Sequence, residues 1–173
     1  MVPLLIRVLA VVLALAAVLP ATADAQPPRW AADLTAGYAA FVDDKTAFLP
    51  AVGGAVRRQL SPRVSVGPEF IVMIGQPDGR GRALMLTGNV VFNAYSVHGR
   101  DSRRLTPFLV GGLGMFWSRE EFVTGPFWSS DPAFTAGGGL RGPIAERISV
   151  SAEYRIGWEL HQRVTGTVTF ELR

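Results

Sequence analysis

The sequence has no cysteine, and its net charge is only +3. Without cysteine no disulfide can form, so packing and hydrogen bonds alone must hold the fold. The arginines are scattered rather than clustered, which argues against a nucleic-acid partner, because such a partner requires a basic patch. Long apolar runs are also absent after the N-terminal region. No later segment reaches the roughly 20 apolar residues that a membrane-spanning helix needs.

The one long apolar run lies near the N-terminus, from Val8 to Leu19, directly after the positively charged Arg7. It is shorter than a membrane-spanning helix, and the small residues of Ala23-Asp24-Ala25 follow it. This order is typical of a secretory signal peptide with its cleavage site. We therefore predict a signal peptide over residues 1–25 and one exported domain over residues 26–173.

The exported part has the period-2 alternation of β-strands. Apolar and polar residues alternate cleanly in Ile148–Trp158, in Val164–Arg173 and in Val64–Ile74, which indicates strands with one apolar face. Pro68 interrupts the third of these, and because proline removes a ladder donor we expect a bulge or a shortened strand there. Together with less regular segments, the pattern predicts eight strands: Asp33–Val42, Phe48–Leu60, Arg63–Gly75, Arg82–Ser96, Arg104–Ser118, Ala133–Pro143, Glu146–Trp158 and Arg163–Arg173.

Eight strands without a spanning helix can cross a membrane only as a closed barrel, since helices and closed barrels alone satisfy every backbone polar group in hydrocarbon. We predict an all-β, eight-stranded, antiparallel up-and-down transmembrane β-barrel. Short turns and longer loops alternate along the chain, as in membrane barrels. The longest connection, Arg119–Pro132, is the predicted outer loop, and Phe122, Phe127 and Trp128 are its candidate contact residues. These aromatics either bind a partner or dip into the outer leaflet.

Aromatic side chains concentrate near the predicted strand ends. Membrane barrels place aromatic girdles at both lipid–water interfaces, so we predict two girdles here. The outer girdle consists of Phe41, Phe48, Trp117, Phe134 and Trp158, and the periplasmic girdle of Phe92, Tyr95, Phe108 and Phe170.

Two glycine-rich stretches carry a resemblance to a known family. The stretch GGGLRGPIAERISVSAEYRIGW (Gly137–Trp158) combines a Gly-rich strand, a tight turn and an alternating strand, and PFLVGGLGMFW (Pro107–Trp117) is a second Gly-rich aromatic strand. With eight strands and a signal peptide, the chain resembles small outer-membrane barrels of the OmpA/OmpX-like type. The resemblance implies a monomer in the Gram-negative cell envelope, with outer-membrane lipid and the barrel assembly machinery as partners. Unlike many members, the sequence ends without an aromatic residue, at Phe170-Glu171-Leu172-Arg173.

The interior of an eight-stranded barrel is only wide enough for side chains. The polar faces of the predicted strands would bring carboxylates and guanidinium groups into it, where unpaired charges are costly. We therefore predict a lumen charge network formed by Glu69, Glu153, Arg155, Glu171 and Arg141.

Catalytic signals are weak. His161 lies beside Glu159 in a predicted outer loop, and Ser129, Ser130 and Asp131 lie in another, but this set is not a recognised motif. No spacing typical of metal ligands occurs. We predict no catalytic, cofactor-binding or metal-binding residues, and no cofactor.

Three functions remain open on the sequence. The preferred one is an outer-membrane barrel with a structural, envelope-integrity or surface-interaction role. The alternatives are a soluble exported lipocalin-like barrel that binds an apolar ligand, and a lipid-modifying outer-membrane barrel enzyme. A membrane barrel turns its apolar faces outward, whereas a soluble barrel turns them around a cavity. The orientation of five apolar residues distinguishes the membrane barrel from the soluble one, and these deciding residues are Ile148, Val150, Tyr154, Val168 and Phe170.

Overall fold

The structure is a computed structural model that describes residues 30–41, 47–75, 81–94, 105–122, 125–157 and 161–172. The chain forms strands along nearly all of these ranges. The eight strands are β1 (Trp30–Phe41), β2 (Ala47–Gln59), β3 (Val64–Ile74), β4 (Gly81–Asn93), β5 (Thr106–Phe122), β6 (Gly125–Ala145), β7 (Ile148–Gly157) and β8 (Gln162–Leu172). In the described part of the chain, no helix is long and apolar enough to cross a membrane.

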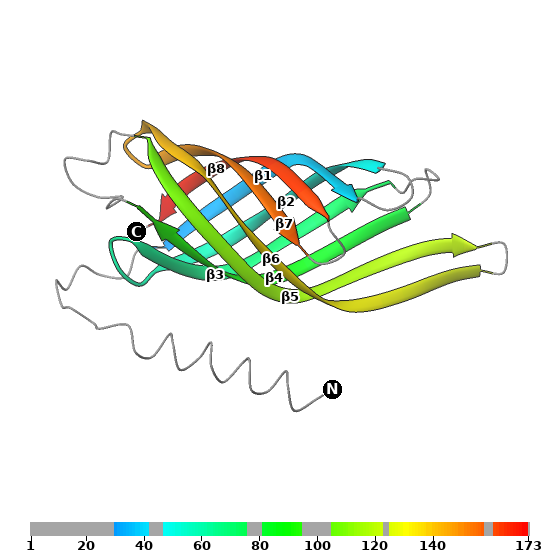
Figure 1. The fold of residues 1–173 in the computed structure, drawn as a ribbon. Helices are drawn as coiled ribbons and strands as arrows, with labels where there is room; N and C mark the ends of the chain where they lie inside the picture. Colours follow the sequence, from blue (N-terminus) through cyan, green and yellow to red (C-terminus); the bar gives the residue numbers. More distant parts are fainter. Residues whose placement is uncertain are drawn as a thin grey trace, which may run out of the picture.

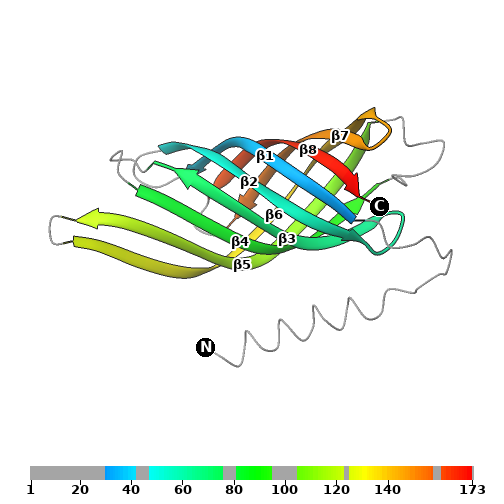
Figure 2. The same cartoon turned by 180° about the vertical axis from the view of Figure 1, so that it is seen from behind.

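The strands close into a single antiparallel barrel in sequence order. Each strand pairs with its neighbour in the chain, and β8 pairs with β1, from Trp30↔Leu172 to Ala40↔Gln162. Figures 1 and 2 show the tilted strands running around the closed wall. Six of the eight predicted strands end within about three residues of the observed bounds. The fold class predicted from the sequence is therefore confirmed.

The barrel has two different ends. At the terminal end, β1 begins and β8 ends, and the tight turns Leu60–Arg63 and Glu146–Arg147 connect β2 to β3 and β6 to β7. At the opposite hairpin end, β5 and β6 continue well beyond the other strands as a two-stranded projection (Figure 1).

This projecting hairpin corrects the predicted outer loop. Residues of the predicted loop Arg119–Pro132 lie in the β5–β6 ladder, which continues through Arg119↔Trp128 to Phe122↔Gly125. Gly125 has φ 125°. Residues with a Cβ disfavour this backbone conformation, so glycine is well suited to the position where β6 begins. The aromatic residues in the segment favour strand structure. The backbone at Phe122, Phe127 and Trp128 is therefore strand rather than loop, and their side chains lie outside the described ones.

The structure has neither a bulge nor an early strand end at Pro68. Strand β3 runs without a break, and Pro68 pairs with Gly88 in the β3–β4 ladder. The prediction of a bulge or shortened strand is therefore wrong. The β2–β3 ladder has a gap between Ala55↔Glu69 and Arg58↔Val66 without a change of register, as the missing N–H of proline explains. A register shift occurs instead between Pro143 and Ala145, beside the β6–β7 turn.

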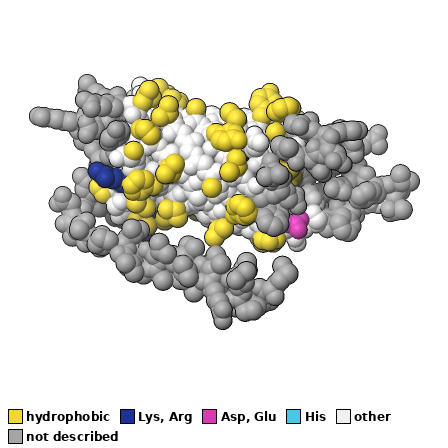
Figure 3. All heavy atoms as spheres, viewed as in Figure 1, with side chains coloured by type: hydrophobic (Ala, Val, Ile, Leu, Met, Phe, Trp, Pro, Cys, Tyr) yellow, Lys and Arg dark blue, Asp and Glu magenta, His cyan; other side chains and the backbone are white. Residues whose placement is uncertain are grey.

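Alternation along the strands sets an apolar outer surface. Leu34, Tyr38 and Val164 face outward with exposures of 63%, 61% and 60%. On the face seen in Figure 3, hydrophobic side chains are spread over the barrel wall, and charged ones show only towards its ends. Among the deciding residues, Val150, Tyr154 and Phe170 are exposed, whereas Ile148 and Val168 are half-buried. The apolar faces therefore point away from the interior.

Candidate functional site

The barrel interior contains an unusual concentration of buried charge. Buried guanidinium groups belong to Arg57, Arg141, Arg155 and Arg163, and buried carboxylates to Asp33, Glu69 and Glu153. Charges removed from water are tolerated when ion pairs and hydrogen bonds compensate them. These side chains form two groups, one at mid-barrel and one at the terminal end.

The mid-barrel group is centred on Glu69 of β3. Its Oε2 accepts a hydrogen bond from Arg155 Nη1 at 3.0 Å, and its Oε1 accepts one from Arg155 Nη2 at 3.2 Å. Arg163 Nη2 donates to the same carboxylate at 3.0 and 3.1 Å, and Asn89 Nδ2 donates at 3.0 Å. One carboxylate therefore links two arginines from β7 and β8 to the opposite side of the barrel.

Glu153 completes the charge balance of this group. It accepts two hydrogen bonds from Arg155, one of them from Nη2 at 3.1 Å, and its Oε1 lies 3.7 Å from Arg163 Nη2. Two carboxylates thus face two guanidinium groups. Glycine makes room for them, because a Cβ on Gly137 would lie 2.7 Å from Arg155 Cα and 2.9 Å from Arg155 Cγ.

The group at the terminal end is built on Asp33 and Arg57. Arg57 donates to both carboxylate oxygens, with Nη2 at 2.8 Å from Oδ1. Thr169 of β8 donates its hydroxyl to Asp33 Oδ1 at 2.6 Å and accepts from Arg57 Nη2 at 3.3 Å. Bidentate pairs of this kind have a well-defined geometry, so they fix β1, β2 and β8 relative to one another at this end.

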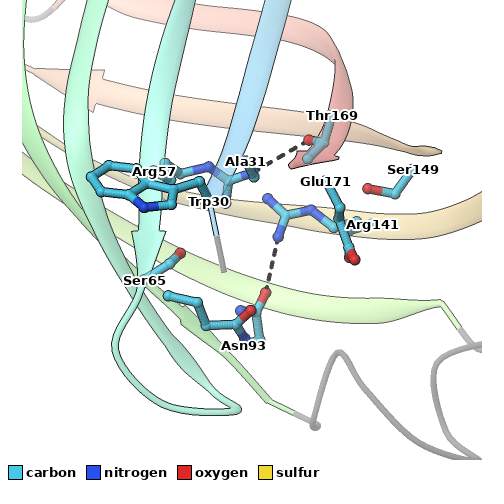
Figure 4. A pocket seen from close by; sticks show the side chains of 10 residues that line it. Trp30, Ala31, Arg57, Ser65, Asn93, Arg141, Ser149, Thr169 and Glu171 are labelled. Atoms are coloured by element: carbon cyan, nitrogen blue, oxygen red, sulfur yellow. Dashed lines mark hydrogen bonds between the residues drawn. The ribbon is translucent and has the colours of Figure 1, made fainter. Parts of the chain in front are cut away.

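Arg141 lies beside that group, on the wall of a small cavity at the terminal end. Its Nη1 donates to Asn93 Oδ1 at 3.4 Å, and its guanidinium carbon stands 5.0 Å from the centre of the Phe108 ring. The cavity has a volume of about 40 Å³. Figure 4 shows its lining, to which Arg57, Ser65 and Glu171 also contribute.

The other half of the interior, nearer the hairpin end, is mainly apolar, with His161 buried beside Phe41. Eight buried side chains form one cluster there, and Phe41 and Phe116 pack against it. The cluster consists of Ala39, Leu49, Ala51, Ile71, Met73, Ala83, Met85 and Ala133. Strand alternation predicted polar side chains throughout the interior, and for this half that prediction is wrong. The strands alternate throughout, but in this half their inward positions carry apolar residues.

The structure joins three of the five predicted network residues, Glu69, Glu153 and Arg155, by ion pairs in the mid-barrel group. Arg141 lines one interior cavity with these three residues and a second one, at the terminal end, with Glu171. The prediction missed Asp33, Arg57 and Arg163. Arg163 shares its face with Thr165, Thr167 and Thr169, so alternation alone could have included it. Nothing in the pattern distinguishes Arg57 from its outward neighbour Arg58.

The predicted aromatic girdles need two corrections. Phe108 is only 3% exposed and faces the interior, where its ring contacts Arg141. Phe41 also lies inside, with its ring centre 6.0 Å from that of Phe116. The predicted girdle residues Phe48, Phe92, Phe134 and Phe170 face outward, and Trp117 is half-buried. Tyr95 and Trp158 lie outside the described residues.

The catalytic candidates occupy separate places. His161 is not a solvated loop residue: it is 3% exposed, its ring centre lies 5.8 Å from that of Phe41, and it stands over Gly157. Ser129 belongs to the projecting hairpin, where its hydroxyl lies 2.8 Å from that of Ser118. Among the described residues, no group of His, Cys, Asp or Glu side chains could hold a metal ion.

Comparisons with known proteins agree with this architecture. No protein-family model matches the sequence, and no curated protein sequence does. Solved structures do match. The N-terminal β-barrel domain of Pseudomonas aeruginosa OprF has a TM-score of 0.64 at 11% identity, covering 82% of this chain and 97% of that one. Neisserial surface protein A has a TM-score of 0.65 at 8% identity, covering 84% and 97%.

A third match is Ail, the attachment invasion locus protein of Yersinia pestis, with a TM-score of 0.57 at 11% identity, covering 85% of this chain and all (100%) of that one. Identities this low establish a shared fold only. Because the matched barrels are covered almost completely, the likeness extends over the whole closed wall rather than over a local motif. The chain thus has the architecture of the small eight-stranded barrels that the sequence resembled.

Proposed function

We propose that this chain is an outer-membrane β-barrel protein of a Gram-negative cell envelope, exported by a signal peptide over residues 1–25. The observation that carries the proposal is the apolar outer wall around a closed barrel. Leu34, Leu109 and Val164 each expose 60% or more of their surface, which is unfavourable in water. A band of outward apolar residues is what lipid acyl chains require of a membrane barrel.

The soluble lipocalin-like alternative fits this structure poorly. A ligand pocket usually has a volume of about 300–1,000 Å³, whereas the two described interior cavities have volumes of about 40 and 20 Å³. Side chains of both interior halves fill the space that a ligand would need. The same filling argues against a wide pore, because the charged groups and the apolar cluster lie across the lumen.

Cell fractionation combined with gel migration tests the location. We expect the protein in the outer-membrane fraction, with a folded form that migrates differently from the boiled form, because a closed barrel resists detergent until heated. Recovery of nearly all the protein in a soluble periplasmic fraction would contradict the proposal. We further propose that the barrel assembly machinery inserts it and that it acts as a monomer.

We propose that the projecting β5–β6 hairpin carries a surface-interaction role, with the terminal end facing the periplasm. Rigid scaffolds commonly present binding residues beyond their cores, and this hairpin extends past every other strand pair that the structure describes (Figure 2). A variant in which a two-residue Asn-Gly turn replaces residues 121–126 would keep the β4–β5 ladder, which ends at Gly81↔Glu120. We expect it to reach the outer membrane and lose attachment to surfaces or partners. If it instead only sensitises cells to detergent, the role is envelope integrity rather than surface interaction.

A further inference from the structure

One side of the projecting hairpin is an open strand edge. Strand β6 pairs with β5 from Gly125 onward, whereas its pairing with β7 begins only at Thr135↔Gly157. Among the residues that the structure describes, no strand therefore pairs with this second edge of β6 over residues 125–134, which extends beyond the barrel in both views (Figures 1 and 2). An open edge exposes unpaired N–H and C=O groups and is a template for pairing with another chain.

The backbone groups that face the open edge can be identified from the paired part of β6. A Cβ on Gly157 would lie 2.7 Å from the carbonyl oxygen of Phe134, so this carbonyl points toward the β7 side. A Cβ on Gly137 would meet the carbonyl oxygen of Tyr154, which points back toward β6 from the position opposite Gly138. Both contacts direct the peptide groups of even-numbered β6 residues toward β7.

This direction extends along the projecting part of the strand. Successive residues of a strand direct their N–H and C=O groups alternately to one edge and to the other. The backbone groups of residues 126, 128, 130 and 132 therefore face the open edge, and those of the residues between them face β5. The unbroken β5–β6 ladder over this segment agrees with that assignment.

Two of these edge-facing positions are prolines, Pro126 and Pro132. Proline has no N–H, so Trp128 and Ser130 are the only backbone donors that face the open edge between them. Neither proline interrupts the β5–β6 ladder, which includes both of them. Natural sheets place proline on open edges, where it blocks pairing with a further strand without weakening the existing ladder.

We propose that Pro126 and Pro132 close the open edge of β6 to strand addition and so prevent the hairpins of neighbouring copies from pairing with one another. A strand long enough to span both prolines would leave two of its own carbonyl groups without a donor. A shorter strand would find only two donors, too few to offset the entropy lost on ordering it. The inference does not depend on the role proposed for the hairpin, because its peptide groups point the same way whatever the hairpin binds.

Amide hydrogen exchange, measured by NMR on the purified protein in detergent micelles, tests the direction of the peptide groups. We expect the amides of Trp128 and Ser130 to exchange at least about tenfold faster than those of Ser129 and Asp131, which bond to β5. Equal rates at neighbouring positions, or slow exchange at Trp128 and Ser130, would overturn the proposal, because the edge would then not be open.

Replacing both prolines tests their protective role. Pro126→Thr combined with Pro132→Thr restores two donors and introduces a residue that favours strands. We expect this double variant to associate in micelles, as measured by sedimentation equilibrium, and its exchange at Ser130 to slow at least about tenfold on association. The unaltered protein should stay monomeric. A double variant that stays monomeric, or an unaltered protein that associates with slowed exchange at Ser130, would overturn the proposal.

Two further variants distinguish edge pairing from misfolding. Pro68→Thr is the matched control, because Pro68 lies in β3 between two strands with which β3 pairs, and it should stay monomeric. Adding Ser130→Pro to the double variant removes a central edge donor without touching the β5 ladder, and it should restore the monomer. Association that persists with Ser130→Pro would show that the double variant does not associate through this edge, which would contradict the proposal.

Discussion

Strand β3 turns Glu69, Ile71 and Met73 toward the same interior, yet these side chains have opposite surroundings. Glu69 is bound by two arginines and an asparagine, whereas Ile71 and Met73 belong to an apolar cluster with no exposed surface at either residue. The mid-barrel and terminal-end half of the lumen is held by directional charge pairs beside a small apolar cluster of Val91, Phe108 and Val110, and the half near the hairpin end is held by packing. The outward face is apolar along both halves, because the outer wall faces the same kind of surroundings along the whole barrel.

The comparison predicts that charge removal is the more damaging change. Glu69→Gln leaves two guanidinium groups facing only Glu153, and an uncompensated buried charge costs about 3–5 kcal/mol. We expect a loss of that size in the free energy of unfolding, measured by urea titration in phospholipid vesicles. Glu146→Gln is the control, because Glu146 is exposed in the β6–β7 turn. Equal stability of the two variants would contradict the charge network.

The apolar half should respond to lost volume instead. Met85 has no exposed surface, and truncating a buried methionine to alanine typically costs about 2–5 kcal/mol because a cavity remains. We expect the stability loss of Met85→Ala to lie near the lower end of this range, since neighbouring alanines leave room for side chains to shift. Met115 is 37% exposed on the outer wall, where lipid can fill the space, so Met115→Ala should cost clearly less. The same urea titration compares them.

A smaller effect is expected from a methyl group that crowds the charged half. In Gly137→Ala the new Cβ would meet Arg155 and the carbonyl oxygen of Tyr154, and overpacking of this kind costs about 1–3 kcal/mol. Gly88→Ala is the matched control, because its nearest neighbour, the Leu113 carbonyl oxygen, would lie at an ordinary 3.9 Å. We expect lower thermal stability for Gly137→Ala only. A similar loss for both would show that strand glycines act through backbone freedom instead.

The smallest predicted effect concerns a neutral pair in the polar half. The hydroxyl oxygens of Thr35 and Thr167 lie 2.9 Å apart, and one such hydrogen bond contributes about 0.5–1.5 kcal/mol. Thr35→Val should cost that amount. Thr167→Val should lower the stability less in the Thr35→Val variant than in the unaltered protein, because its hydrogen-bond partner is already missing there. Additive losses in thermal denaturation would indicate that the two hydroxyls do not interact.

The sequence predicted the wall of the barrel better than its contents. Period-2 alternation determines which side chains share a face, so β7 and β8 were located to within a few residues. It does not say which strands face one another across the lumen, and Arg163 of β8 meets Glu69 of β3 only through that closure. Asp33 pairs with Arg57 of the adjacent strand β2, a diagonal contact that alternation alone does not select. The girdle prediction for Phe108 rested only on its position near a strand end. Its inward-facing position in the alternation and the space beside Gly139 place its ring inside the barrel.

Spin labels at successive positions of β8 test the central claim most directly, and the absence of cysteine makes single labelling sites simple to introduce. In vesicles, we expect high accessibility to oxygen, which concentrates in lipid, at positions 164 and 166. We expect low accessibility at positions 165 and 167, whose side chains face the filled interior. High oxygen accessibility at the two threonine positions, or no alternation between neighbours, would contradict the account.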